Sequence, residues 1–383
     1  MYRKFQADGI FTGSDLLDES HVLIAETDGT VVNIISQEEA GDDVERSKGV
    51  LSPGFINCHC HIELSYLKNK IPRHTGLIDF VLAVLAGRKV DPHIQMEAMK
   101  AAARELYESG TVAVGDICND AASIPLKINS PLQWTNFIEI SGFVNDTAQQ
   151  KFNSALEVAK KFTALPFPCA IVPHASYSVS GNLFQLINDN SKELISIHNQ
   201  EAADEDELYA SKSGGFLKLY EKLGIDISGF KPTGKSSLCS WLPHFTHQQK
   251  IISVHNTFTK QSDVDIAKDL IYCLCINANL YIEDKLPPLE LLMNNNCNIV
   301  VGTDSYASNT QLNILEEMKT IQKCFPSVDT ATILQWATIN GAEALGLSDQ
   351  FGSFGKGVRP GIVLLEDMQG LRFTQSSMAK RLL

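Results

Sequence analysis

The segment of this 383-residue chain best suited to chemistry carries two histidines, two residues apart, at the end of an apolar run. Residues 51–61 read LSPGFINCHCH, and side chains of an extended strand alternate between its two faces. His59 and His61 are therefore predicted to project to one side, away from Cys58 and Cys60. Neutral imidazole is the commonest protein ligand for zinc-like ions, so the pair predicts half of a metal site. Alone it would favour two ordinary buried histidines, but the rest of the chain reverses that preference.

Other apolar runs also end in residues that suit a metal-dependent hydrolase. The polar residues at these ends are His174, His198, His255 and Asp304. Five of the ten histidines thus fall at predicted strand ends, whereas random placement would scatter them over helices and loops. In a parallel barrel the carboxyl ends of the strands converge at one mouth, so these side chains are predicted to meet.

Glu201 follows His198 by three residues and could reach into the same pocket. A hydrolase of this kind needs a Lewis acid that lowers the pKa of water from 15.7 toward ~7, and a nearby carboxylate that takes and returns the proton. Asp304 could supply the oxygen ligand. Two simpler interpretations stay open: Glu201 could be an exposed residue at the start of an acidic helix, and Asp304 could cap a helix.

The elements that must position these residues alternate along the chain. Val/Ile-rich runs alternate with helical patterns, which is typical of a parallel sheet buried on both faces. The runs span 111–114, 169–172, 194–197, 251–254 and 298–301, and the helical patterns span 96–108, 155–163 and 312–324. Residues 51–355 are therefore predicted to form an α/β fold, a (β/α)8 TIM barrel. Short strands with turn signals at residues 1–50 and 356–383 predict one small β-sandwich domain built from both chain ends.

Composition excludes several classes of protein. Hydrophobic residues make up 44% of the chain, which suits a large buried core, and no stretch approaches the roughly 18 apolar residues of a membrane helix. A net charge of −13 disfavours nucleic-acid partners, so a small-molecule substrate is expected. Nine cysteines without Cys-x-x-Cys spacing fit a reducing cytoplasm, and no secretion signal is indicated.

Six segments, in this order, resemble the successive signatures of the amidohydrolase superfamily. They are 53–61 (PGFINCHCH), 172–178 (VPHASYS), 196–201 (SIHNQE), 252–256 (ISVHN), 302–309 (GTDSYASN) and 337–345 (ATINGAEAL). The closest branch is the cyclic-amidine deaminase and chlorohydrolase group. The resemblance implies one divalent ion, zinc or alternatively iron, held by His59, His61, His198 and Asp304. It also implies that Glu201 shuttles protons and that His255, with Asp304, orients the attacking water.

Binuclear members of this superfamily use a carboxylated lysine or a carboxylate at the end of the fourth strand, where this chain has His174. A single ion is therefore expected, and the resemblance assigns His174 to substrate binding. Glu63 is a second candidate for substrate binding if the strand stays extended beyond His61, but it could equally be a loop carboxylate. Asn277 and Asn279 match the family pattern only loosely as ring contacts.

Residues 61–65 (HIELS) resemble aminodeoxyfutalosine deaminases, which implies hydrolytic deamination of an aminopurine base or nucleoside. Dechlorination or hydrolysis of another heterocycle is the alternative, and similar enzymes are often homodimers. Residues 229–236 (GFKPTGKS) satisfy the P-loop pattern, which suggests a different class of protein, a nucleotide-binding protein. A helical pattern rather than a buried strand precedes this segment, so nucleotide binding there is disfavoured.

Overall fold

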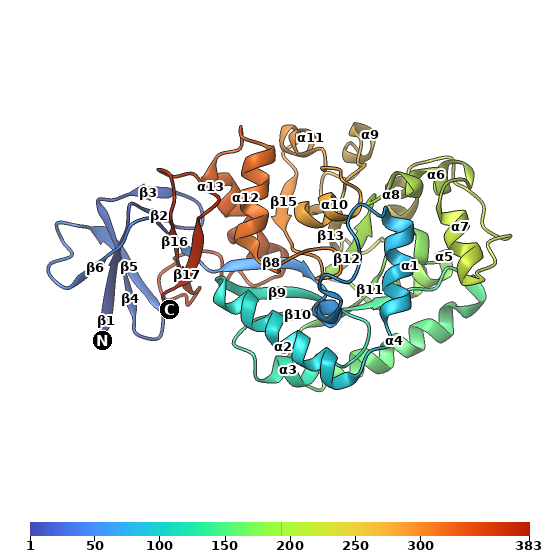
Figure 1. Cartoon of the computed structure of the whole chain (residues 1–383), viewed down its shortest axis with the longest axis horizontal. Helices are drawn as coiled ribbons and strands as arrows, with labels where there is room; N and C mark the ends of the chain where they lie inside the picture. The colour runs from blue at the N-terminus through green and yellow to red at the C-terminus, as the bar shows by residue number, and fades with distance from the viewer. Residues whose placement is uncertain (193) are drawn as a thin grey trace.

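The computed structural model describes residues 1–192 and 194–383, and its strands fall into two groups (Figure 1). Strands from both ends of the chain lie together at the left of Figure 1, close to the two termini. The remaining strands run through the larger part of the molecule, where helices flank them. This larger part contains the predicted site.

The terminal strands form two sheets with the orders β5-β4-β1-β6 and β17-β16-β7-β2-β3. Their bounds are β1 (Tyr2–Gln6), β2 (Gly9–Phe11), β3 (Leu16–Asp18), β4 (His21–Glu26), β5 (Val31–Ser36), β6 (Val44–Arg46), β7 (Val50–Pro53), β16 (Ile362–Glu366) and β17 (Met378–Arg381). The sheets share an apolar cluster that includes Phe5, Leu51 and Ile362. Since β16 pairs with β7, the predicted boundary at residue 50 falls on the first residue of a terminal strand.

The central strands form two parallel sheets, β11-β10-β9-β8 and β12-β13-β14-β15. Their bounds are β8 (Phe55–Cys60), β9 (Thr111–Cys118), β10 (Gln133–Ile140), β11 (Cys169–Pro173), β12 (Leu194–Asn199), β13 (Lys250–His255), β14 (Ile271–Leu274) and β15 (Asn298–Val301). The amide of His198 donates to the carbonyl of His174 at 2.9 Å, and the amide of Thr303 donates to the carbonyl of His59 at 3.0 Å. These bonds join the sheets at both edges, so the carboxyl ends of β8, β11, β12 and β15 are neighbours.

Helices follow most of the central strands. Their bounds are α1 (Leu77–Gly87), α2 (Pro92–Glu108), α3 (Ile124–Ile128), α4 (Ala148–Thr163), α5 (Gly181–Asn190), α6 (Ala203–Ser211), α7 (Phe216–Leu223), α8 (Ser237–Trp241), α9 (Gln261–Val264), α10 (Ile276–Ile282), α11 (Leu289–Asn294), α12 (Ile314–Cys324), α13 (Thr330–Ala337) and α14 (Ile339–Ala344). Local sequence sets several ends: Asp91 and Asp329 cap α2 and α13, and Gly224 ends α7 in the left-handed conformation. Over the described residues, no helix has the length and apolarity that crossing a bilayer requires.

The predicted α/β class is confirmed. Each apolar run named from the sequence lies in a strand, namely β9, β11, β12, β13 or β15, and the three helical patterns fall in α2, α4 and α12, apart from residues 312–313. Strands β10 and β14 were not predicted from the sequence. The segment after β8 also differs from expectation, because Ile62–Leu67 forms a 3-10 helix, η1, instead of continuing the strand.

Candidate metal centre and active-site cavity

Three histidines and one aspartate converge at the carboxyl ends of β8, β12 and β15. His59 and His61 come from β8 and the residue after it, His198 comes from β12, and Asp304 follows β15. One ligand atom from each of the four lies within 4.8 Å of those of the others, and all four residues are buried. The structure thus brings together the four residues predicted to hold a metal.

The spacing of these atoms fits one divalent ion. Nε2 of His61 lies 3.1 Å from Nε2 of His59, 3.2 Å from Nε2 of His198 and 3.3 Å from Oδ1 of Asp304. Four tetrahedral ligands at zinc–nitrogen distances of 2.0–2.1 Å would lie about 3.3 Å apart. Burial lowers the pKa of His59 to about 4, so its imidazole is neutral and has a free lone pair at neutral pH.

A backbone carbonyl fixes the orientation of His198. Its Nδ1 lies 2.8 Å from the carbonyl oxygen of His174 and donates a proton to it. The proton of the neutral ring is therefore on Nδ1, which leaves Nε2 as the ligand atom.

Asp304 is held in a backbone conformation that few residues adopt. Its φ is 56°, in the left-handed region, and the Ser308 hydroxyl donates to Oδ2 so that Oδ1 faces the histidines. Burial alone would raise the pKa of this carboxyl, but its contacts with His59 and the other nearby imidazoles hold it well below its usual value. Such strain is typical of positions that the surrounding structure maintains for function.

Glu201 and His255 face each other beside this centre. Oε1 of Glu201 lies 3.6 Å from Nε2 of His255, and both side chains are almost wholly buried. Nδ1 of His255 donates to Oδ1 of Asn279 at 2.8 Å, and Nδ2 of Asn279 donates back to the carbonyl of His255 at 3.3 Å. Nε2 of His255 is thus left as an acceptor, with no hydrogen-bond partner among the described residues. Burial, followed by the charge of Asp304, raises the pKa of Glu201 well above its usual value.

A second carboxylate holds the backbone of Glu201. Glu205, on α6, accepts hydrogen bonds from the amides of Glu201 at 2.7 Å and Gln200 at 3.1 Å, and from the Ser176 hydroxyl at 3.0 Å. Gln200 has a φ of 46°, so these bonds secure an unfavourable backbone turn. Glu205 was not predicted from the sequence to have a role in the site.

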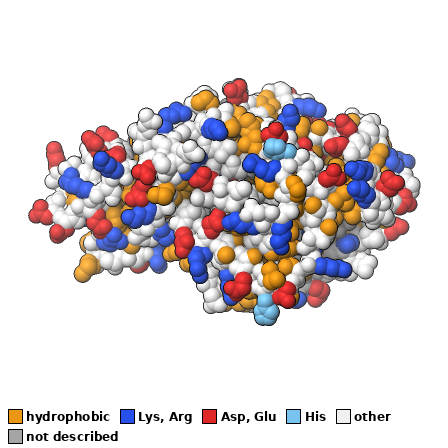
Figure 2. Space-filling view, viewed as in Figure 1, with side chains coloured by type: hydrophobic (Ala, Val, Ile, Leu, Met, Phe, Trp, Pro, Cys, Tyr) orange, Lys and Arg blue, Asp and Glu red, His pale blue; other side chains and the backbone are white. Residues whose placement is uncertain are grey.

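These residues open onto a cavity of about 530 Å³. The polar side chains that line it include the buried Glu201 and His255 together with Asn119, Glu139, His174 and the exposed Arg88. Apolar side chains from α1 and α7 also line the cavity, among them Leu77, Phe80, Val84 and Leu219. Hydrophobic side chains also gather on the surface in the region of α1 (Figure 2), where Leu85 is 37% exposed.

The sequence profile of the amidohydrolase family matches residues 50–379. The chain belongs to the amidohydrolase family. The resemblance inferred from the six segments is thereby confirmed, and the matched range contains every residue of the metal centre and of the Glu201–His255 pair.

Relatives of this amidohydrolase carry deaminase names. The 5'-deoxyadenosine deaminase of Methanococcus vannielii is 26% identical over 365 residues, which cover 89% of this chain and 81% of the relative. The aminodeoxyfutalosine deaminase of a Nitratiruptor species is 26% identical over 330 residues, which cover 83% of this chain and 79% of the relative. The crystal structure of Helicobacter pylori aminofutalosine deaminase in complex with methylthio-coformycin superposes with a TM-score of 0.82 at 21% identity, covering 100% of both chains. The amidohydrolase and this enzyme share a fold.

His174 lines the cavity of the amidohydrolase, where it was predicted to contact substrate. Its Nδ1 lies 2.7 Å from the Ser178 hydroxyl, and its carbonyl accepts the proton of His198. The imidazole of His174 is not one of the four converging ligands. Its backbone therefore supports the centre while its ring faces the cavity.

Glu63 does not share the strand face of His59 and His61, because the strand does not continue beyond Cys60. The strand ends at Cys60, and Ile62 already belongs to η1 because its amide donates to Oδ1 of Asp116 at 2.9 Å. Glu63 is buried outside the cavity lining and accepts a hydrogen bond from the Asn119 amide at 2.9 Å. Burial raises its pKa to about 8.

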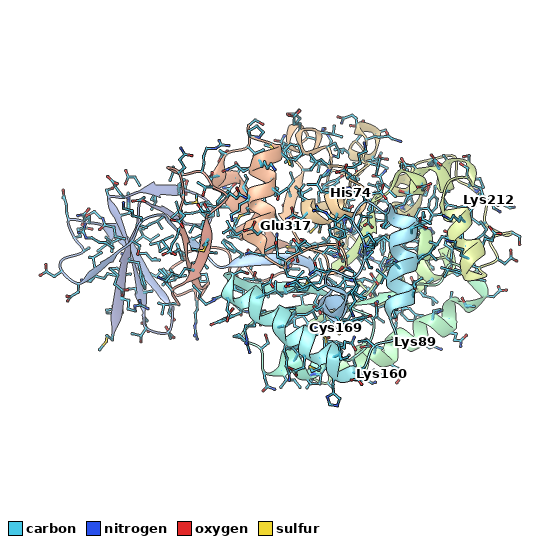
Figure 3. The ribbon with its side chains drawn as sticks, viewed as in Figure 1. His74, Lys89, Lys160, Cys169, Lys212 and Glu317 are labelled. Carbon is cyan, nitrogen blue, oxygen red and sulfur yellow. The ribbon has the colours of Figure 1, made fainter. Side chains whose placement is uncertain are left out.

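The side chains of Asn277 and Asn279 both make hydrogen bonds to other residues of the protein. Asn279 orients His255, whereas Asn277 bonds to Glu317 of α12 (labelled in Figure 3) and to Thr320. Glu317 is fully buried and also accepts from Asn309, which ties the loop after Asp304 to the start of α10. Neither asparagine lines the cavity.

The P-loop segment lacks the structure that phosphate binding requires. Residues 229–236 lie in the connection between α7 and α8, so a helix and not a strand precedes them. The Ser236 hydroxyl caps α8 and donates to Asp263, and Lys235 is exposed. The structure therefore disfavours nucleotide binding at this segment.

Several polar residues that line the cavity were not predicted from the sequence, among them Arg88, Asn119 and Glu139. Glu139 is the informative one, because it stands at the end of β10 as His174 stands after β11. β10 reads QWTNFIEI, and its interspersed polar residues obscure the apolar run. The alternation of β-strands and helices could have indicated a missing strand between residues 114 and 169.

Proposed function

We propose that this amidohydrolase is a metal-dependent hydrolytic deaminase of an aminopurine nucleoside. One observation carries the proposal: the four converging ligands lie beside a buried carboxyl, Glu201, at the inner end of a cavity large enough for a nucleoside. Family membership and the deaminase names of its relatives support a hydrolase acting on C–N bonds of cyclic amidines.

His59, His61, His198 and Asp304 would hold the ion. Three imidazoles and one carboxylate suit zinc, and iron is the alternative. When bound, such an ion polarises water and lowers its pKa toward neutrality.

Glu201 and His255 would move the protons. Glu201 takes a proton from the attacking water and delivers it to the ring nitrogen next to the amino-bearing carbon, work that suits a carboxyl with a raised pKa. Nε2 of His255, free to accept, orients the water and, once protonated, donates to the oxygen of the tetrahedral intermediate. A C–O bond forms, and the remaining proton of the attacking water passes through this pair to the amino group. The C–N bond then breaks, and ammonia leaves as the ring carbonyl forms.

His174 would contact the substrate through the ring edge that faces the cavity. Glu63, held away from the cavity by Asn119, would act on the substrate only indirectly by fixing that loop. An aminodeoxyfutalosine-like nucleoside is one candidate substrate. Dechlorination or another hydrolysis of a heterocycle is the second candidate, since triazine hydrolases share the fold with a TM-score of 0.76.

We also infer the finer architecture. The two central sheets, hydrogen-bonded at both edges, would form a (β/α)8 barrel over residues 51–355, and the terminal sheets would form a β-sandwich from residues 1–50 and 356–383, with β7 joining the latter. A cytoplasmic homodimer is the proposed state of the protein.

The deciding experiment measures bound metal and then ammonia release. Purified protein loaded with zinc or iron would be assayed with adenosine, 5'-deoxyadenosine, adenine, guanine and a chlorotriazine. We expect one ion per chain and release of ammonia from a nucleoside. Chloride release without ammonia release would favour the second candidate, and inactivity on every compound would overturn both.

A further inference from the structure

One carboxylate oxygen of Glu139 is buried in the cavity wall with no hydrogen-bond partner among the described residues. The side chain is 6% exposed and lines the cavity at the end of β10. Oε2 accepts a hydrogen bond from Nδ2 of Asn119 at 2.9 Å, whereas Oε1 has no donor. Leaving a buried charged acceptor unpaired costs free energy, so this oxygen calls for an explanation.

The neighbouring histidines do not satisfy Oε1. Nδ1 of His198 lies 3.6 Å away, beyond hydrogen-bond distance, and its proton is already donated to the carbonyl of His174. Nδ1 of His174 is bonded to the Ser178 hydroxyl. Glu139 therefore does not serve as the outer partner that commonly orients a ligating histidine.

A second metal ion does not explain Glu139 either. Glu139, His174 and His198 do offer atoms within 4.8 Å of one another. However, Nδ1 of His198 is protonated and Nε2 of the same ring faces the first centre, so His198 has no lone pair left for another ion.

The partner of the carboxylate, Asn119, is itself held by two hydrogen bonds. Asn119, which binds Oε2, is fixed at its own amide by Glu63 at 2.9 Å and at its Oδ1 by Nη2 of Arg88 at 3.0 Å. A buried carboxylate oxygen that has no donor, on a residue that lines the cavity, is preorganised to receive a donor from a ligand.

We propose that Glu139 is a specificity-determining residue whose Oε1 accepts a hydrogen bond from a donor on the substrate, close to the ring that is attacked. This inference rests on the proposed function. A carboxylate can only accept, so the donor is a hydroxyl or an N–H group. In a 6-aminopurine nucleoside the N–H groups belong to the departing amine, so the donor is a hydroxyl of the sugar, whereas a free base would present a ring N–H.

The test pairs a substitution with substrates that lack one donor. Glu139→Gln, loaded with metal, is compared with the unmodified enzyme on adenosine, 2'-deoxyadenosine, 3'-deoxyadenosine and adenine. We expect kcat/KM for adenosine to fall by about 10- to 100-fold, chiefly through KM, as loss of a hydrogen bond to a charged group predicts. For the unmodified enzyme, kcat/KM should fall by a similar factor on the deoxyadenosine that lacks the contacted hydroxyl. For Glu139→Gln, removing that hydroxyl should lower kcat/KM little further.

Two further measurements separate binding from folding and chemistry. Calorimetry of inosine, the product of adenosine deamination, should show the same weakening in Glu139→Gln with no reaction taking place. Bound metal should be unchanged. Glu139→Asp keeps the charge but withdraws the oxygens, so its affinity for inosine should lie between those of the unmodified enzyme and Glu139→Gln. Glu157→Gln, on the exposed face of α4, provides a matched control.

Each outcome decides between named alternatives. A hydroxyl dependence that disappears in Glu139→Gln supports a sugar donor, and a loss of equal size on adenine supports a ring N–H donor. Unchanged kcat/KM and inosine affinity, or loss of metal from the variant, would overturn the inference while the proposed function stood. If the unmodified enzyme released ammonia from no aminopurine, the proposed function itself would fail.

Discussion

Glu205 binds the amide nitrogen of Glu201 through a carboxylate oxygen at 2.7 Å. The two residues lie four positions apart, and the second oxygen of Glu205 holds the amide of Gln200 at 3.1 Å. The group proposed to carry the proton is thereby anchored through its backbone. Glu205 therefore fixes the backbone of the carboxyl that we propose to be catalytic.

Replacing Glu205 by glutamine should impair turnover. Both oxygens of Glu205 accept hydrogen bonds from backbone amides, and the NH2 group of glutamine cannot accept one. One buried backbone amide would therefore lose its partner, and the backbone of Glu201 would shift. We expect kcat to fall by about 10- to 100-fold with metal retained, the scale of a small misplacement of a reacting group. Steady-state kinetics and metal analysis check this, with Glu207→Gln on the exposed side of α6 as control. An unaltered kcat would show that Glu201 does not need this anchor.

Glu201→Gln should keep the metal and lose the chemistry. The amide is nearly isosteric but cannot transfer a proton, so turnover should drop by at least about 100-fold, the scale of general acid–base catalysis. Metal content by atomic absorption should match that of the unmodified protein. Turnover within a factor of two would remove Glu201 from the mechanism.

His198→Ala and His174→Ala should differ in metal content. Loss of the His198 ring removes a ligand, so metal affinity should fall by more than the roughly 10- to 100-fold typical of losing an outer partner, and activity should be lost with it. The carbonyl of His174 remains in His174→Ala, so this variant should keep the ion and lose about tenfold or more in kcat/KM. Equal metal loss in both variants would contradict the assignment of His174.

Stability should depend on pH through Glu317. Burial raises its pKa to about 8 from an ordinary value of 4.5, so the folded chain binds a proton that the unfolded chain releases between these values. This contribution is complete below about pH 4.5 and is lost as pH rises toward 8, with a slope of up to about 1.4 kcal/mol per pH unit. Urea unfolding of Glu317→Gln between pH 5 and 8 should show a shallower decline than the unmodified protein. Parallel curves would indicate that Glu317 is already ionised.

The metal centre was predictable because its ligands follow apolar runs. Buried parallel strands need continuous hydrophobic sequence, and the polar residue after each one is placed at a shared edge. His198, His255 and Asp304 therefore stood out without any structure.

Glu63, Glu139 and Glu205 show what the sequence could not reveal. Glu63 leaves the strand direction because Asp116 holds the Ile62 amide, a contact between residues 54 positions apart. The sequence of β10 does not read as a continuous apolar run, because it contains Asn136, a buried polar residue that accepts a hydrogen bond from the buried Lys127. Such polar pairing inside the core depends on tertiary contacts that no local pattern encodes.

The hydrogen bonds from Thr303 and Asp304 to the carbonyl of His59 join the first central strand to the last. Ligands 245 positions apart thus become neighbours only after the intervening chain has been arranged. Metal binding would accordingly be one of the last events in folding. It would stabilise the native arrangement of the central strands over partly folded forms. A polypeptide that ended before residue 298 would contain His59 and His61 but would lack β15 and the ligand Asp304.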